Sequence, residues 1–468
     1  MYFAYDRNAT IKHFCHSYYI QKERSASAME IISSYKVQIV GINKMLKPTL
    51  DIYRNALALL IPIVFKEWDD VSKIEMPKAK FSFVEKLIHS TKNNKAKYPE
   101  FDKQFYKMPC YFRRAVTNEA IGIVSSHVSR MENWKKSGMQ GKEPKLQINH
   151  FACPTFYRGN SYLTTDNPDV VQLKLYVRND WIWVPVKLRH TDMQYITKCS
   201  GKMSAPTLER KRNKYYLRFA FKESVIIDKT PIANQRILAV DLGVNNDAVC
   251  SVMDANGTVL NRKFINFHSE KDRLYHTLNK IKKKQKLHHA TNQLWSYAVN
   301  CNEQHAIHIA HAIIEHAVQQ KVHCIVFEHL DMNGKIHGKK KQKLAMWRKQ
   351  YIQGIVAHKA HRNGIRISHV NAWNTSKLAF DGTGKVVRDD KNYSMCKFAG
   401  GKLYHCDLNA SYNIGARYFI REILKTLPAR VRSQVETKVS LLAKRTQCTL
   451  STLISMNAAL SGEIPSVA

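Results

Sequence analysis

Alternating polar and apolar residues in the first half of the chain predict strands on both sides of a helical segment. Four segments alternate like strands: 35–40, 171–177, 181–186 and 215–221. From about Thr49 to Asn133, after Pro48, apolar residues recur instead at helical spacing. We therefore expect an antiparallel β-barrel or sandwich made of residues 1–47 and 145–230, with a helical domain at 48–144 inserted into it.

From Pro231 onward the pattern is that of an α/β domain. Its first three strands follow one another with hairpin signals, including the turn Asn256-Gly257. The expected strands are 237–241, 248–253, 259–267, 322–327 and 365–370, and the expected helical stretches are about 269–320, 346–361 and 409–427. The tail from Pro428 to residue 468 is expected to be helical and polar.

Three acidic residues occupy comparable places in this α/β region. Asp241 follows four apolar residues, Glu328 ends a second apolar strand, and Asp407 stands where a helix begins. Carboxylates from neighbouring strand ends and a helix start can converge to hold two divalent ions that act on a phosphodiester. Oxygen ligands favour Mg²⁺ or Mn²⁺. The alternative is that each acid only caps a turn or a helix, and Asp407 is an obvious N-cap candidate.

The charge balance points to a polyanionic partner. The chain carries 74 Lys+Arg against 37 Asp+Glu, a net charge of +37, and a basic surface of this size is typical of nucleic-acid-binding proteins. A solvated cationic face is the alternative. The candidate contacts are Tyr111, Arg113 and Arg114 at a predicted helix start, and the lysine runs Lys282, Lys283, Lys284 and Lys339, Lys340, Lys341.

No membrane segment or export signal is expected. The longest apolar run, residues 56–65, is too short to span a bilayer and contains Pro62. Residues 1–5 lack a charged segment followed by an apolar one. The ten cysteines are scattered, which favours reduced thiols in a cytoplasmic protein.

The three acidic segments resemble a known set of motifs. Residues 240–246 (VDLGVNN), 325–330 (IVFEHL) and 407–414 (DLNASYNI) are similar, in order and separation, to the split RuvC motifs of the TnpB family of transposon-encoded RNA-guided nucleases. Type V CRISPR effectors descend from that family. The similarity is strong from about residue 235 to 420 and weaker before it.

This resemblance implies a multidomain α+β fold, with a RuvC/RNase H-like nuclease domain at 231–371 and 407–427. It also implies a β-barrel wedge domain interrupted by a helical recognition domain. Asp241, Glu328 and Asp407 would be the catalytic, metal-binding triad. The implied partners are a guide RNA and double-stranded DNA with a short flanking motif, in the cytoplasm of a bacterium. The implied reaction is RNA-guided DNA cleavage with Mg²⁺ or Mn²⁺.

One departure from the family concerns its four-cysteine zinc ribbon. Residues 372–406 occupy the place of this target-nucleic-acid-binding insert, but 375–382 contains no cysteine and Ala399 stands where the partner of Cys396 is expected. Cys396 and Cys406 alone cannot form a tetrahedral structural site. We therefore expect a ribbon-like shape without zinc.

Other functions stay open at this point. A guide-dependent DNA binder that represses transcription would be expected to lack one of the acids, and a DNA-strand-transfer transposase would act without RNA. A structural RNA-binding protein would leave the three acids unexplained. The type and length of the guide, the flanking motif and the oligomeric state are not indicated by the sequence.

Overall fold

The computed structural model describes most of the chain and divides it into two units. The described residues are 28–148, 151–199, 201–211, 213–227, 229–329, 346–389, 392 and 394–461. The first unit comprises the described residues of 32–223, and the second comprises 28–31 and those from 224 onward. Each unit has its own hydrophobic core. The protein therefore has the mixed α+β, multidomain architecture that we expected.

The first unit is built on a seven-stranded antiparallel sheet in the order β2-β3-β4-β1-β7-β5, with β6 also paired to β7. Its strands are β1 (Ala28–Val40), β2 (Tyr162–Thr164), β3 (Val170–Val177), β4 (Asp180–Leu188), β5 (Lys202–Met203), β6 (Thr207–Lys211) and β7 (Lys214–Ile226). A short helix, α6 (His190–Ile196), follows β4.

The expected closed β-barrel is not present among the described residues. The strands at the two ends of the sheet, β2 and β5, are short, and neither pairs with the other. Residues 154–156 run beside β6 instead: the Phe156 N–H donates to the Pro206 carbonyl (2.8 Å), and the Leu208 N–H donates to the Pro154 carbonyl (2.9 Å). Because an irregular segment occupies this edge, the sheet stays open where a barrel would close.

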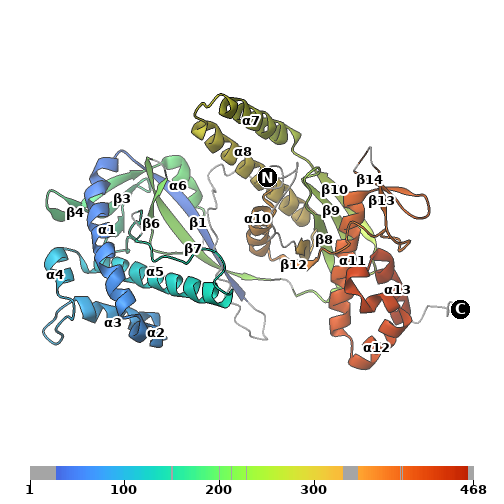
Figure 1. Ribbon diagram of the computed structural model, residues 1–468, viewed down its shortest axis with the longest axis horizontal. Coiled ribbons are helices and arrows are strands. Elements are labelled where there is room, and N and C mark those ends of the chain that lie inside the picture. Colours follow the sequence, from blue (N-terminus) through green and yellow to red (C-terminus); the bar gives the residue numbers. More distant parts are fainter. Residues whose placement is uncertain are drawn as a thin grey trace. The chain divides into compact units, whose positions relative to one another are not determined.

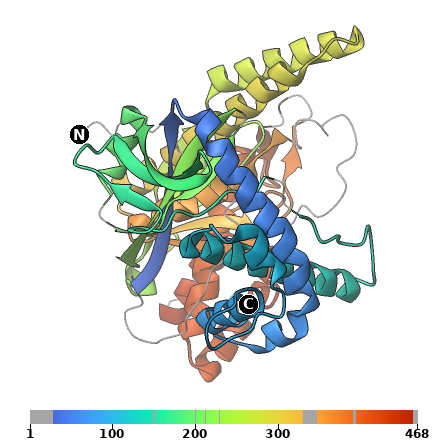
Figure 2. The same ribbon diagram turned by 90° about the vertical axis from the view of Figure 1, so that its left-hand side faces the viewer.

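Five helices lie between β1 and β2 in the chain: α1 (Asn43–Lys66), α2 (Trp68–Lys73), α3 (Pro77–Ile88), α4 (Glu100–Phe105) and α5 (Cys110–Lys136). The two long helices, α1 and α5, lie side by side, and α1 also crosses the sheet (Figure 1 and Figure 2). Val37 and Ile39 of the sheet share one core with apolar side chains of α1.

Helix α1 is longer than the sequence pattern indicated, because it continues through Pro48 and Pro62. Each proline removes one backbone hydrogen bond, but a row of fully buried apolar side chains holds the helix in place: Leu46, Leu50, Leu57, Leu60, Ile61 and Val64. The segment 44–66 is long and apolar enough to cross a membrane by length and composition alone. Half of its most apolar window is buried within the unit, as in a core helix of a globular domain.

The second unit contains a five-stranded sheet in the order β10-β9-β8-β11-β12. Its strands are β8 (Arg236–Asp241), β9 (Ala248–Asp254), β10 (Val259–Ile265), β11 (Cys324–His329) and β12 (Arg366–Asn371). The first three form the expected antiparallel meander, whereas β11 runs parallel to both β8 and β12. The carboxyl ends of β8, β11 and β12 therefore lie at one edge of the sheet.

The helical stretch after β10 is a hairpin of two helices, α7 (His268–Lys286) and α8 (Asn292–Gln319), which lie side by side (Figure 1). His288, in the connection, has a positive φ of 52°, which ends the helical path. A third helix, α10 (Lys349–Arg362), packs against α8 and leads into β12.

Residues after β12 form a small three-stranded sheet of β13 (Val387–Arg388), β14 (Met395–Lys397) and β15 (Leu403–His405). Cys396 of β14 and Cys406, which directly follows β15, are buried neighbours. Aromatic rings pack around them: the ring of Phe380 lies 5.5 Å from that of Phe398 and 5.0 Å from that of Tyr404, centre to centre. An apolar aromatic cluster thus holds this insert together.

The chain ends in helices α11 (Cys406–Thr426), α12 (Ala429–Lys438) and α13 (Leu450–Ser461), with short 3-10 turns between α12 and α13. The prediction of a polar tail was wrong for α13. Leu453 and Met456 are fully buried in the core beneath α11. Ser, Thr and Asn residues interrupt the apolar pattern of this helix, which is why the sequence pattern did not reveal it.

Candidate active site

The three predicted carboxylates come from elements that meet at the edge where the parallel strands end. Asp241 is the last residue of β8, and Glu328 is the next-to-last residue of β11. Since Val240 pairs with Phe327 in the parallel register, Asp241 and Glu328 follow at the same level. Asp407 comes from α11, which packs on β8, β9, β11 and β12. All three side chains are half-buried.

Asp407 does not cap its helix, so the expectation that it is an N-cap residue was wrong. The helix begins at Cys406, its N-cap is His405, and no side chain caps it. Asp407 lies in the first helical turn, where the helix dipole favours a negative charge. Its carboxylate is held from another segment: Asn246 Nδ2 donates to Asp407 Oδ2 over 2.7 Å.

Two glycines allow these elements to come together. A Cβ atom on Gly243 would lie 2.6 Å from the Asn246 carbonyl oxygen, so the tight turn after Asp241 requires glycine. A Cβ atom on Gly415 would lie 3.1 Å from Met253 Sδ and 3.3 Å from Ala239 Cβ. The absence of a side chain at Gly415 therefore allows α11 to approach the sheet closely.

The carboxylates influence one another electrostatically. Burial raises the pKa of Asp241 well above its ordinary value, and the negative charges of Glu328 and Asp407 raise it further, while Arg388 opposes the shift. Burial also raises the pKa of Glu328; a hydrogen bond from Thr375 Oγ1 and the charges of Arg417 and Lys349 oppose that increase. The site thus concentrates negative charge that a bound cation would neutralise.

The donors present are hard oxygen ligands, which suit Mg²⁺ or Mn²⁺. Among the described residues, however, no group of three or more His, Cys, Asp or Glu side chains is arranged to hold a metal ion. The carboxylates are therefore close enough to interact but do not form a preassembled set of ligands.

A polar network behind the site fixes the turn that carries Asn246. Asn266 Nδ2 donates to Asn246 Oδ1 (2.7 Å), and Lys271 Nζ donates to Asn266 Oδ1 (3.0 Å). Lys271 also pairs with the buried Asp247 (3.0 Å), which lies 3.1 Å from His305 Nε2 of α8. These contacts lower the pKa of Asp247, although burial alone would raise it. The network thus links α7 and α8 to Asp407.

Substitution of Asn246 by alanine is expected to lower the affinity of the carboxylates for Mg²⁺ about 10- to 100-fold, because Asp407 loses the donor that orients it. The measurement is a Mg²⁺ titration followed by the melting temperature of the protein. Asn256→Ala is the matched control, because Asn256 is exposed at the opposite end of the same sheet. Equal Mg²⁺ dependence in both variants would contradict this role.

The structure describes two of the three predicted sets of nucleic-acid contacts. Lys282, Lys283 and Lys284 are exposed on α7. A hollow of about 820 Å³ between α7 and α8 is lined by Arg273, Lys280, Lys282, Lys283, Lys286 and Tyr297, and its described lining includes no carboxylate. Lys339, Lys340 and Lys341 lie outside the described residues.

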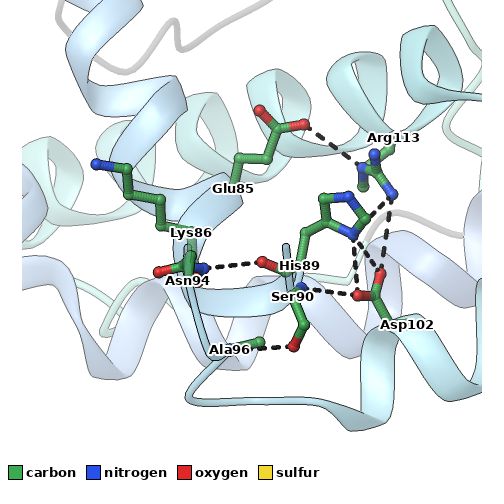
Figure 3. Close-up of polar contacts among 8 residues, drawn as sticks. All are labelled: Glu85, Lys86, His89, Ser90, Asn94, Ala96, Asp102 and Arg113. Carbon is green, nitrogen blue, oxygen red and sulfur yellow. Dashed lines mark hydrogen bonds and ion pairs between the residues drawn. The ribbon is translucent and has the colours of Figure 1, made fainter. Parts of the chain in front are cut away.

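Arg113 is largely engaged within the first unit (Figure 3). Its side chain is 14% exposed; its Nε lies 3.5 Å from Glu85 and its Nη1 lies 3.8 Å from Asp102. Asp102 also lies 2.9 Å from His89 Nδ1 and accepts the Ser90 N–H over 3.0 Å. Arg113 thus ties α5 to α3 and α4, and a nucleic-acid contact by this residue stays a prediction.

Arg114 and Tyr111 lie beside aromatic rings of the same unit. The Arg114 guanidinium lies 5.4 Å from the ring centre of Phe81 and 5.6 Å from that of Tyr157. The rings of Tyr111 and Tyr157 are 5.6 Å apart. Tyr111 is half-buried, whereas Arg114 is exposed. These contacts agree with a helix anchored by its aromatic residues and leave base stacking as a prediction.

Three residues that the structure places at the site had no predicted role: Asn246, Thr375 and Arg417. Asn246 stands within the first motif, five residues after Asp241, so its position was a usable signal. The partners of Thr375 and Arg417 are distant in sequence, and no local pattern marks them.

Comparison with known proteins identifies two segments of the chain. Residues 350–414 match the model of the Cas12f1-like TNB domain, and residues 33–177 match that of the Aq_aa04 family. No curated protein sequence matches the chain.

Among solved structures, the mini-RNA-guided endonuclease CRISPR-Cas_phi3 is 10% identical with a TM-score of 0.50, and the match covers 82% of this chain and 92% of that one. The Cas12f1–sgRNA–target DNA complex is 14% identical with a TM-score of 0.49, covering 80% and 81%. The chain carries a Cas12f1-like TNB domain within a fold similar to that of Cas-phi3, so the resemblance to TnpB/Cas12-like nucleases is confirmed.

Proposed function

We propose that this protein is an RNA-guided DNA endonuclease with one RuvC-like active site. The observation that carries the proposal is the meeting of Asp241, Glu328 and Asp407 at one sheet edge, beside a segment that matches the Cas12f1-like TNB domain. The similar solved structures are an RNA-guided endonuclease and a complex with guide RNA and target DNA. We extend these partners, double-stranded DNA included, to this chain.

In this proposal, residues 231–371 and 407–427 form the nuclease domain, and residues 372–406 form the target-binding insert. Residues 48–144 form the recognition domain, inserted into the open wedge sheet. The arrangement lets a guide RNA select the DNA by base pairing while the protein holds the duplex through its backbone.

Asp241, Glu328 and Asp407 would hold the divalent cations. When bound, a pair of such ions activates water and stabilises the leaving oxygen of the phosphodiester. The Thr375 hydroxyl donates to the Glu328 carboxylate and so favours its ionised form against the effect of burial. Asn246 Nδ2 donates to the Asp407 carboxylate and orients it. These two donors thus help to hold both carboxylates in position.

Binding of Mg²⁺ should stabilise the folded protein, and more so at higher pH. Because the folded-state pKa of Asp241 is raised, the metal-free protein binds more protons folded than unfolded. Its stability should therefore fall as pH rises from the ordinary carboxyl range through the raised pKa. A bound cation favours the ionised carboxylate and so offsets this loss. At a 100-fold excess over its Kd, the cation raises the free energy of unfolding by about 2.7 kcal/mol in total.

Thermal unfolding with and without Mg²⁺, at two pH values, checks this expectation. Asp241→Asn should be more stable than the wild type without metal at neutral pH, and Mg²⁺ should stabilise it less. An equal increase in Tm with Mg²⁺ for both proteins would contradict the metal site.

The basic hollow between α7 and α8 should contact phosphates. Replacing Lys280 and Lys283 by alanine should weaken DNA or RNA binding to a similar degree for all sequences. It should also lower the slope of log K against log salt by about one per lysine that contacts a phosphate. Lys438→Ala, on exposed α12, is the matched control. An unchanged salt slope in the double variant would exclude the hollow as a binding site.

The whole proposal is tested by purifying the protein with its bound nucleic acid, sequencing any RNA, and assaying Mg²⁺-dependent cleavage of DNA that matches it. A discrete RNA with cleavage supports the guided nuclease. A discrete RNA without cleavage indicates a repressor, and cleavage or joining without RNA indicates a strand-transfer enzyme.

A further inference from the structure

Trp373 is exposed beside the proposed active site. It lies two residues after the end of β12, and its side chain is 67% exposed. Single exposed apolar residues are common on protein surfaces and by themselves indicate nothing. The segment that presents this indole is unusual because its backbone is held from several sides.

The backbone of this segment is held by hydrogen bonds, two of them from the buried Arg417 side chain. The Trp373 N–H donates to Asn371 Oδ1 (2.8 Å), and the Trp373 carbonyl accepts from Arg417 Nη1 (2.7 Å). The same Arg417 nitrogen donates to the Asn371 carbonyl (3.0 Å). Arg417 is 6% exposed, and Asn374 adopts a positive φ of 64°. The main chain is therefore rigid, while the indole is left in solvent.

The same segment reaches the catalytic carboxylates. Thr375, two residues after Trp373, donates its hydroxyl hydrogen to Glu328. Two extended residues span at most about 7 Å, so the backbone of Trp373 lies close to the carboxylate's hydrogen-bond donor. Two positive side chains are near enough to act on the carboxylates: Arg388 on Asp241 and Lys349 on Glu328. An exposed aromatic residue, two positions from the donor to Glu328, thus accompanies cations close to the carboxylates.

We propose that Trp373 is a stacking platform for a base of single-stranded DNA next to the phosphate that is cut. The inference rests on the proposed nuclease function and adds a binding subsite to it. An aromatic face accepts any unpaired base, whereas a base inside a duplex is already stacked on both sides. The subsite would therefore bind a displaced or melted strand with little sequence preference, and it would place the strand across the carboxylates.

The test uses the full-length protein carrying Asp241→Ala, so that bound DNA stays intact. The probe is a mixed-sequence single-stranded oligonucleotide that contains 5-iododeoxyuridine, cross-linked by light and mapped by mass spectrometry. We expect a cross-link at Trp373. In the same background, Trp373→Ala should lower affinity for the oligonucleotide by about 5- to 150-fold, the range given by loss of one stacked base. Trp373→Phe should retain most of the affinity.

Ile454→Ala is the matched control, because Ile454 is an exposed apolar residue near the Gly257 turn, at the opposite end of the sheet. The Ile454→Ala protein should bind the oligonucleotide with unchanged affinity. A Trp373→Ala protein that binds as tightly as this control would overturn the subsite. Equal cross-linking and affinity for an RNA oligonucleotide of the same sequence would overturn the assignment to DNA.

Failure of this inference is distinguishable from failure of the proposed function. If Asp241→Ala abolishes cleavage but Trp373→Ala binds and cuts normally, only the subsite is wrong. If Asp241→Ala still cuts, the proposed active site itself is wrong.

Discussion

Replacing Asp241 by alanine should abolish DNA cleavage while leaving RNA and DNA binding intact. Asp241 is close enough to both other carboxylates that their negative charges raise its pKa. Loss of this residue removes a ligand of the proposed ions, whose stabilisation of the transition state is worth several kcal/mol. The expected decrease in the cleavage rate is about 10³-fold or more.

A single-turnover cleavage assay, together with a binding assay on the same preparation, measures this effect. Asp254→Ala is the control: Asp254 terminates β9 opposite Arg236, at the other end of the sheet, where it accepts hydrogen bonds from turn residues. This control should cleave at the wild-type rate. Cleavage by Asp241→Ala at the control's rate would exclude the carboxylates as catalytic residues.

Replacing Arg417 by leucine should lower the free energy of unfolding more than any other substitution proposed for this protein. The buried guanidinium donates to four backbone carbonyls, those of Asn371, Trp373, Thr446 and Cys448. It joins α11 to the loop after β12 and to the segment before α13. Each buried carbonyl left without a donor costs about 1–3 kcal/mol, so a total loss of about 3 kcal/mol or more is expected.

Denaturant unfolding of the two proteins gives the free energy directly. Arg421→Leu, one turn later on α11, is the matched control, since Arg421 is 36% exposed and contacts His369 and Ser368. Arg421→Leu should lower the free energy of unfolding clearly less than Arg417→Leu does. A larger effect at Arg421 than at Arg417 would show that Arg417 does not hold these segments together.

Local sequence patterns predicted those strands whose residues are all buried. Residues Ile237 to Val240 are all buried in the centre of the sheet, so an uninterrupted apolar run marked the strand and placed Asp241 at its end. Glu328 was found in the same way on β11. Sequence periodicity also indicated the helices around 269–320, although not the break near His288.

Features that depend on distant partners could not be predicted. Asn246 donates to Asp407, 161 residues later, and Arg417 is fixed by carbonyls from two other segments. Whether a sheet closes into a barrel depends on its two edge strands, and here residues 154–156 occupy one edge without forming a strand. Helix α1 continues through two prolines because its buried side chains outweigh the lost hydrogen bonds.

The aromatic cluster that packs the small insert could not be predicted from local sequence patterns either. The sequence indicated that Cys396 and Cys406 could not hold zinc alone, but not what would support the insert. The structure supplies Phe380, Phe398 and Tyr404 for this purpose. Their spacing along the chain follows neither a helix nor a single strand, so no periodicity brings them together.

The most direct test of the central proposal is to redirect cleavage by changing the RNA. The variable end of the co-purified RNA would be replaced by a new sequence, the complex reassembled, and two DNA molecules offered: one matching the old sequence and one matching the new. The account predicts Mg²⁺-dependent cutting of the new target only, and none with Asp241→Ala. Cutting that ignores the change of RNA, or that persists in Asp241→Ala, would contradict it.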